Sequence, residues 1–177
     1  RKFLLMKIVL CGYMGSGKTS VGFRLSKTLL VPYFDLDKYI SNAESRSISA
    51  IFLEFGEIYF RKLESKALKD VLIFEGDGVV ALGGGTPCYG DNLSFILNQT
   101  DVKLIYLKAS ISTIVNRISS KNNSRPLLMH LNSAADKREF IAKHLFERRF
   151  FYEQAHHTIN VDNKSLEEVV EDCLALL

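Results

Sequence analysis

The sequence lacks the features by which several classes of protein are recognised. It has three cysteines, Cys11, Cys88 and Cys173, and this odd, widely spaced set matches neither a disulfide framework nor a metal cluster. No apolar run reaches the roughly 18 residues that a membrane-spanning helix needs. The net charge of +3 suits small anionic ligands but is far from a nucleic-acid-binding signature. We therefore expect a cytoplasmic protein that binds neither nucleic acid nor membrane.

The sequence also lacks internal repeats, low-complexity segments and linkers. Its 177 residues suit one domain with a sizeable core, so a single domain is expected over residues 1–177. Residues 1–5 precede Met6, the expected natural start, and are too few for the charged and apolar regions of a signal peptide. They are expected to be an upstream extension.

A phosphate-binding loop of the form G-x-x-x-x-G-K-[ST] lies at residues 12–19, GYMGSGKT. An apolar run precedes it and a helical pattern follows it, which is the strand, turn and helix setting that this motif requires. Its glycines let backbone N–H groups converge on phosphate oxygens. Lys18 then places its charge on the β- and γ-phosphates, and Thr19 offers a hydroxyl to Mg²⁺. The sequence thus predicts a nucleoside triphosphate site with one magnesium ion.

Strand-like and helix-like segments alternate along the chain. Strands are predicted at about residues 7–11, 31–34, 79–82, 104–107 and 158–161, and helices at about 17–30, from 37, 48–55, 57–72, 91–98, 110–119, 134–153 and from 165. This alternation predicts a three-layer α/β fold in which helices cover both faces of a five-stranded parallel sheet. Residues 119–133 are polar and irregular, and they predict a mobile lid.

Two aspartates, Asp35 and Asp37, follow the second predicted strand, at the sheet edge where ligands bind in such folds. One can hold Mg²⁺ through water and the other can accept a proton from a substrate hydroxyl, although an aspartate here can also cap the next helix. The third predicted strand lacks the aspartate that often orients Mg²⁺ in phosphate-loop enzymes. Asp35 would have to take this role.

Glycines and arginines supply the candidates for binding an anionic substrate. Residues 83–85, three glycines, form either a plain tight turn or a set of N–H groups presented to an anion. Arg61 and Arg148 could clamp a carboxylate, and Arg125 could close over the γ-phosphate from the predicted lid. Single arginines are more often surface charges or ion-pair members. The four histidines show no metal-ligand pattern and are interpreted as structural or surface residues.

Six motifs occur in an order that resembles the shikimate kinase family, small P-loop kinases of aromatic amino-acid biosynthesis. They are GYMGSGKT at 12–19, FDLD at 34–37, SISAIF at 47–52 leading to GEIYFRKLE at 56–64, LGGG at 82–85, RPLL at 125–128 and RRFFYEQA at 148–155. Gluconate and adenylate kinases share the first motif but would not carry FRxxE and RPLL together. The resemblance runs from Met6 nearly to the end of the chain. It implies transfer of the ATP γ-phosphoryl group to the 3-hydroxyl of shikimate by a protein that is usually monomeric.

The resemblance also implies roles for individual residues on the acceptor side, within a substrate-binding region at 37–64 and beyond it. Asp37 matches the shikimate-binding aspartate and candidate base, and Gly84 matches a glycine that contacts the substrate. Arg61 and Arg148 match the carboxylate-binding arginines, and Glu64 matches the acid that orients the first of them. Arg149 stays an alternative to Arg148, whose four-residue spacing to a tyrosine fits the family's R-x-x-x-Y.

On the nucleotide side the resemblance makes Asp35 the aspartate that holds a Mg²⁺-bound water and Thr19 a ligand of the same ion. Arg117 matches the arginine that packs on adenine, and Arg125 matches the lid arginine near the phosphates. The implied nucleotide-binding set is Gly15, Ser16, Gly17, Lys18, Thr19, Ser20, Arg117 and Arg125, with Lys18 and Arg125 catalytic beside Asp37.

Two other functions stay open at the level of the sequence. The first is phosphorylation of another small metabolite, such as gluconate, by a P-loop kinase. The second is a nucleotide-binding module without transferase activity, against which the base candidate, the paired arginines and the predicted lid all argue.

Overall fold

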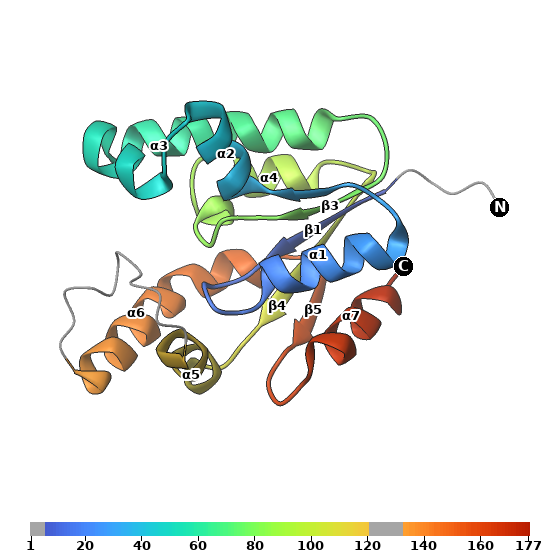
Figure 1. Ribbon diagram of the computed structural model, residues 1–177. Coiled ribbons are helices and arrows are strands. Elements are labelled where there is room, and N and C mark those ends of the chain that lie inside the picture. Colours follow the sequence, from blue (N-terminus) through green and yellow to red (C-terminus); the bar gives the residue numbers. More distant parts are fainter. Residues whose placement is uncertain (1–5, 121–132) are drawn as a thin grey trace.

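The computed structural model describes residues 6–120 and 133–177, and its centre is one parallel sheet (Figure 1). The strand order is β2-β3-β1-β4-β5, and each neighbouring pair runs parallel. The central strand β1 is buried at every residue because helices cover both faces of the sheet. The strands are β1 (Lys7–Cys11), β2 (Tyr33–Asp35), β3 (Gly78–Ala81), β4 (Val102–Lys108) and β5 (His157–Asn160).

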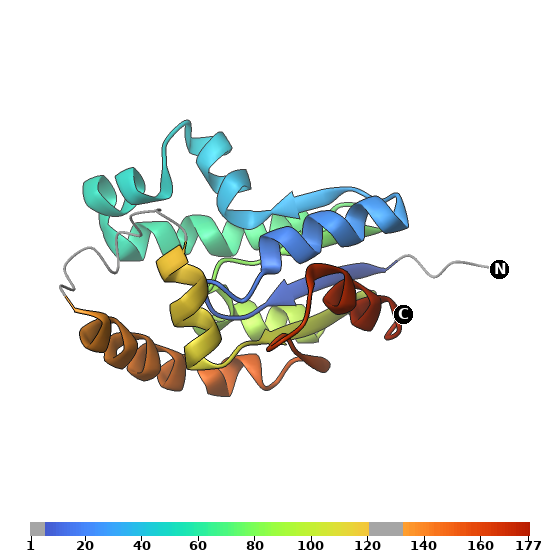
Figure 2. The same cartoon turned by 60° about the horizontal axis from the view of Figure 1, so that its bottom comes forward.

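Two layers of helices enclose this sheet (Figures 1 and 2). One face carries α1 (Lys18–Leu29) and α7 (Leu166–Leu174), which pack against each other. The other face carries α3 (Ile48–Ile73), α4 (Asn92–Leu97) and α6 (Ala134–Tyr152). The helices α2 (Leu36–Glu44) and α5 (Ile111–Ser120) pack on α3 and α6, and a short 3₁₀ turn, η1 (Thr86–Cys88), follows the three glycines. The predicted three-layer architecture is confirmed.

Side-chain caps explain where several helices begin. The Ser47 hydroxyl accepts a hydrogen bond from the Ala50 N–H at the start of α3. Ser165 and Glu168 form a reciprocal capping box at the start of α7. The predicted break at Gly56 is present as a kink within α3, where φ is 82° and ψ is 174°, outside the helical region.

The second strand begins later than predicted, at Tyr33 instead of residue 31. The reason is the end of α1, where Leu30 adopts a left-handed conformation with φ of 57° and the Val31 N–H donates to the carbonyl of Ser26. This turn uses the residues that the apolar pattern assigned to the strand.

Most of the predicted lid, like residues 1–5, lies outside the described residues. Within the predicted lid range, residues 119–120 belong to α5, and Ser133 caps α6 by accepting a hydrogen bond from the Asp136 N–H. Among the helices of residues 6–120 and 133–177, none combines the length and apolar character that a bilayer crossing demands.

Candidate active site

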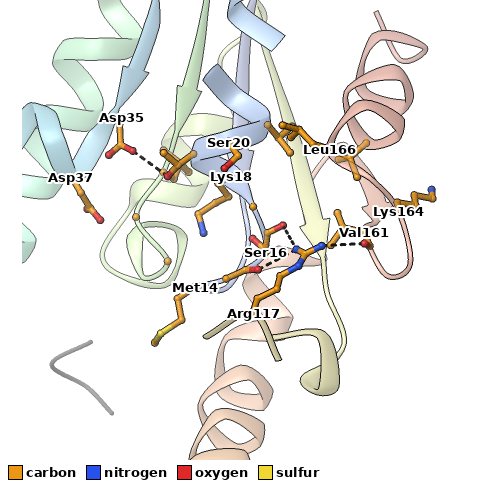
Figure 3. Close-up of a pocket in the computed structure, with 18 of the residues that line it drawn as sticks. Met14, Ser16, Lys18, Ser20, Asp35, Asp37, Arg117, Val161, Lys164 and Leu166 are labelled. Carbon is orange, nitrogen blue, oxygen red and sulfur yellow. Dashed lines mark hydrogen bonds between the residues drawn. The ribbon is translucent and has the colours of Figure 1, made fainter. Parts of the chain in front are cut away.

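Two adjoining cavities open at the carboxyl ends of the strands. The larger, about 410 Å³, lies over the turn from β1 to α1 and is here called the phosphate-loop cavity (Figure 3). The smaller, about 230 Å³, lies between α3, α6 and the three glycines and contains Arg61 and Arg148; it is called the arginine cavity. The two share four lining residues: Met14, Asp37, Gly83 and Gly84. A ligand in one cavity therefore borders a ligand in the other.

The phosphate loop is held in shape by its glycines and by its lysine. Gly12 has φ of 144°, and a Cβ there would lie 2.6 Å from the Leu107 carbonyl oxygen of β4, so only glycine fits this close approach. The Lys18 ammonium donates to the carbonyls of Gly12 and Tyr13 at 2.7 and 3.0 Å. In Figure 3 this side chain projects into the space between Asp37 and Met14, where a charge would meet phosphate oxygens.

Arg117 connects α5 to the phosphate loop. Its Nη1 donates to the carbonyls of Gly15 and Ser16, both at 3.2 Å, and its Nη2 donates to the Val161 carbonyl after β5 at 3.4 Å (Figure 3). The guanidinium therefore lies on the far side of the loop from Asp37, on the same side of the cavity as Lys164, which precedes α7, and Leu166, which begins it. This is where the base of a nucleotide would extend from phosphates held by the loop.

Asp35 caps α2, as the sequence allowed, and also contacts Thr19. Its Oδ1 accepts a hydrogen bond from the Lys38 N–H and caps α2, while its Oδ2 accepts one from the Thr19 hydroxyl at 3.3 Å (Figure 3). The Tyr33 hydroxyl also lies 3.4 Å from this Oδ2, a contact that no sequence pattern indicated.

A hard divalent cation fits the oxygens of Thr19 and Asp35. Within the described ranges no group of three or more His, Cys, Asp or Glu side chains is placed to hold a metal ion. A hydroxyl and a carboxylate alone suit a cation that keeps several waters and takes its other ligands from phosphate oxygens.

Asp37 lies in the first turn of α2 and borders both cavities. Although the cleft leaves it open to solvent, the surrounding protein removes enough water to raise the pKa of its carboxyl to about 6. The negative charges of Asp35 and Glu64 raise this pKa further, while Lys18 and Arg61 oppose them. A carboxyl that titrates near neutrality is suited to exchange a proton with a bound hydroxyl.

Two carboxylates and an aromatic ring hold Arg61 in place. Its Nη1 donates to Glu64 Oε2 at 2.9 Å, while its Nε and Nη2 contact Glu57 Oε1 at 3.3 and 3.2 Å. The ring of Tyr89 lies 3.8 Å from the guanidinium carbon. Glu64 is only 1% exposed and accepts a second hydrogen bond from the Thr86 hydroxyl at 2.8 Å. The guanidinium is therefore oriented before any ligand arrives.

The missing side chains of Gly83 and Gly85 make room for charged groups of the site. A Cβ on Gly83 would lie 2.8 Å from Asp37 Oδ1, and a Cβ on Gly85 would lie 2.8 Å from Arg61 Nη1. Arg148 Nη1 lies 3.7 Å from the position of a Cβ on Gly84. The glycine run, called the glycine floor below, is thus more than a plain turn, because the side chains of Asp37, Arg61 and Arg148 all lie close to it.

The tandem arginines of α6 point to different places. Arg148 is half-buried and lines the arginine cavity. Arg149 is exposed and pairs with Glu153 at 2.6 Å, one turn along the same helix. The hydroxyl of Tyr152 donates to the Gly84 carbonyl, a contact consistent with the R-x-x-x-Y spacing. Ser20 lines the phosphate-loop cavity beside Thr19, whereas Arg125 lies outside the described residues.

A family model described as "Shikimate kinase" matches residues 14–177. The chain belongs to the shikimate kinase family. A shikimate kinase of Flavobacterium johnsoniae is 44% identical over 171 residues, covering 97% of this chain and 98% of the relative. Membership of the shikimate kinase family identifies the protein as a phosphoryl-transferring enzyme with a P-loop nucleotide site.

Solved shikimate kinase structures match the fold over the same length. The crystal structure of the enzyme from Bacteroides thetaiotaomicron superposes with a TM-score of 0.89 at 33% identity, covering 97% of this chain and 98% of that one. Shikimate kinase from Acinetobacter baumannii in complex with shikimate gives a TM-score of 0.83 at 28% identity, covering 97% and 92%. The predicted family and fold are confirmed, while the roles of single residues stay predictions.

Proposed function

We propose that the protein transfers the γ-phosphoryl group of ATP to the 3-hydroxyl of shikimate, giving shikimate 3-phosphate and ADP. The observation that carries this proposal is the sharing of Asp37 by the phosphate-loop cavity and the arginine cavity. A triphosphate held by the loop would end beside the carboxylate that faces the second cavity. The two substrates would then meet at the group suited to exchange a proton.

On the donor side, we propose that ATP binds through the loop residues Gly15 to Ser20. Lys18 and the loop N–H groups would neutralise the β- and γ-phosphates, and Arg117 would lie against the adenine. Thr19 would bind one Mg²⁺ directly, and Asp35 would hold it through a water. The ion would supply charge neutralisation on the phosphate oxygens. Arg125 belongs to this set by resemblance alone.

On the acceptor side, shikimate is a small polyhydroxy carboxylate, so the site must hold one anion and aim one hydroxyl. We propose that Arg61 and Arg148 grip the carboxylate, that Gly84 contacts the ring, and that Asp37 aligns the hydroxyl and accepts its proton. Glu64 would keep Arg61 oriented. Phosphoryl transfer needs orientation and charge stabilisation more than covalent help, so this positioning accounts for most of the catalysis.

A single domain acting as a monomer is part of the proposal, because residues of one chain line both cavities. The small net charge of +3 supports small-molecule partners without nucleic acid. A cytoplasmic location fits the three free thiols.

A substrate panel tests the proposed function. The purified protein is given ATP and Mg²⁺ with shikimate, with gluconate or without acceptor, and ADP release is followed together with product identity by mass. Shikimate should stimulate ADP release and gain one phosphoryl group, while gluconate and the acceptor-free reaction stay at background. ADP release that favours gluconate would indicate another small-metabolite kinase. Release that ignores every acceptor would indicate a nucleotide-binding module.

A further inference from the structure

Helix α6 presents three side chains at intervals of four residues toward three parts of the active site. His144 meets Tyr13 of the phosphate loop, Arg148 lines the arginine cavity, and Tyr152 donates to the carbonyl of Gly84. Residues four apart lie one above the other on one helix face. A single rigid element therefore contacts the donor loop, the acceptor pocket and the glycine floor between them.

The contact between Tyr13 and His144 is close and partly buried. The Tyr13 hydroxyl and His144 Nδ1 are 2.9 Å apart, and the two rings meet edge to face with centroids 5.5 Å apart. Tyr13 is only 1% exposed, and Phe140 packs against the imidazole with a centroid distance of 5.3 Å. Because the Tyr13 carbonyl accepts a hydrogen bond from the Lys18 ammonium, the same residue joins the helix to the phosphate-binding lysine.

The environment of the imidazole as a whole disfavours its protonation. Burial lowers the pKa of His144 below its usual value of 6.5, and Arg148 one turn along α6 lowers it further. Arg61 of α3 acts in the same direction, whereas Glu147 of α6 and Glu57 of α3 oppose it. The ring is therefore neutral at neutral pH, and its hydrogen bond to Tyr13 is one between uncharged groups.

We propose that Tyr13 and His144 are positioning residues that couple the conformation of the phosphate loop to the placement of Arg148. This proposal rests on the proposed function and deepens it. When phosphates occupy the loop and draw Lys18 toward them, Tyr13 and its partner on α6 keep Arg148 aligned for the shikimate carboxylate. Coupling between two binding sites is reciprocal, so shikimate should strengthen nucleotide binding by the same factor.

The measurement is the dissociation constant of shikimate, by calorimetry, with and without saturating ADP and Mg²⁺. In the unaltered protein we expect ADP to tighten shikimate binding by about fivefold or more. The ratio of the shikimate dissociation constant without ADP to that with ADP should fall to near one in Tyr13→Phe and in His144→Leu. The double variant should show no additional loss, because each single change already removes the same contact. His144→Asn, which keeps a hydrogen-bonding group near the position of Nδ1, should retain part of the ratio.

His156→Leu is the matched control. The Nδ1 atom of His156 also forms a hydrogen bond, which it accepts from the Leu104 N–H of β4 at 2.9 Å, but this contact lies away from both cavities. This change should lower the melting temperature and leave the ratio unchanged. A ratio near one in the unaltered protein would overturn the coupling. So would a full ratio in Tyr13→Phe and His144→Leu with lowered melting temperatures, because the contact would then be only structural. Failure of shikimate to bind the unaltered protein at all would refute the proposed function instead.

Discussion

The phosphate-loop cavity and the arginine cavity, here called the donor half and the acceptor half of the site, lie side by side but are lined by different kinds of group. The first is centred on one continuous segment, the phosphate loop, which places backbone carbonyls around Lys18. The second is made by charged side chains that arrive from α2, α3 and α6 onto a glycine floor. Backbone groups can recognise any phosphate, whereas oriented side chains recognise one arrangement of carboxylate and hydroxyls. The donor half therefore suits any phosphate-bearing ligand, whereas the acceptor half determines which substrate is bound.

The difference predicts that the two halves fail in different ways. Damage to the donor half should stop phosphoryl transfer whatever the acceptor. Damage to the acceptor half should change shikimate affinity or the proton-transfer step while nucleotide binding persists. The changes below separate these outcomes.

Lys18→Ala should cause the largest loss. The ammonium is the positive side chain that lies inside the loop, and removing it should lower kcat by about a hundredfold to a thousandfold or more. The control is Lys27→Ala, an exposed lysine on the same helix. The rate is measured by ADP release at saturating shikimate. A near-normal kcat in Lys18→Ala would contradict the role assigned to the phosphate loop in the reaction.

Asp37→Asn should lower kcat by about a hundredfold, within the range for loss of a general base, and leave the nucleotide dissociation constant nearly unchanged. The amide keeps the size of the carboxyl beside Gly83 but cannot accept the hydroxyl proton. Calorimetry with ADP and Mg²⁺ reports the donor half independently. A strong loss of ADP binding would mean that Asp37, not Asp35, serves the metal ion.

Arg61→Lys should weaken shikimate binding by about tenfold, because the lysine keeps a charge but loses the planar fork of donors. The lysine is preferable to alanine here, since alanine would leave the buried Glu64 without its charged partner. The shikimate KM and the ADP dissociation constant are measured together. An unchanged KM would exclude Arg61 from the carboxylate clamp.

Acid should inhibit the reaction through Asp37. With a pKa of about 6, this carboxyl is ionised above that pH and protonated below it, so a base becomes unavailable as pH falls. The value of kcat/KM for shikimate should fall about fivefold between pH 6 and pH 5. Asp37→Asn should abolish this limb of the profile. A profile that persists in that variant would assign the titration to another group.

The phosphate loop of the donor half was readable from the sequence because its residues are contiguous. The loop motif and the following helix depend on local backbone preferences, and both lie where predicted. The break at Gly56, on the acceptor side, is equally local and is also present. Glu57 and Arg61, four residues apart on a helix, form an ion pair that their spacing also indicates, although it was not among the predictions.

The acceptor half was readable only as a set of candidates. Tyr89 on Arg61, Thr86 on Glu64 and Tyr13 on His144 join segments that lie far apart along the chain, and no local periodicity indicates such pairs. The histidines were interpreted as structural or surface residues, and the hydrogen bond between His144 and Tyr13 is a structural contact whose partner the sequence did not indicate. Which polar side chains contact one another across such distances depends on the tertiary fold.

The most direct test of the two-part site is a titration of shikimate into Arg148→Ala and Arg149→Ala. Arg148 faces the arginine cavity, whereas Arg149 pairs with Glu153 in solvent. Loss of a charge-assisted pair should raise the shikimate dissociation constant at least about tenfold in Arg148→Ala, with Arg149→Ala within about twofold of the unaltered protein and ADP binding unchanged in both. Equal effects of the two changes, or a larger effect of Arg149→Ala, would contradict the assignment of the acceptor half.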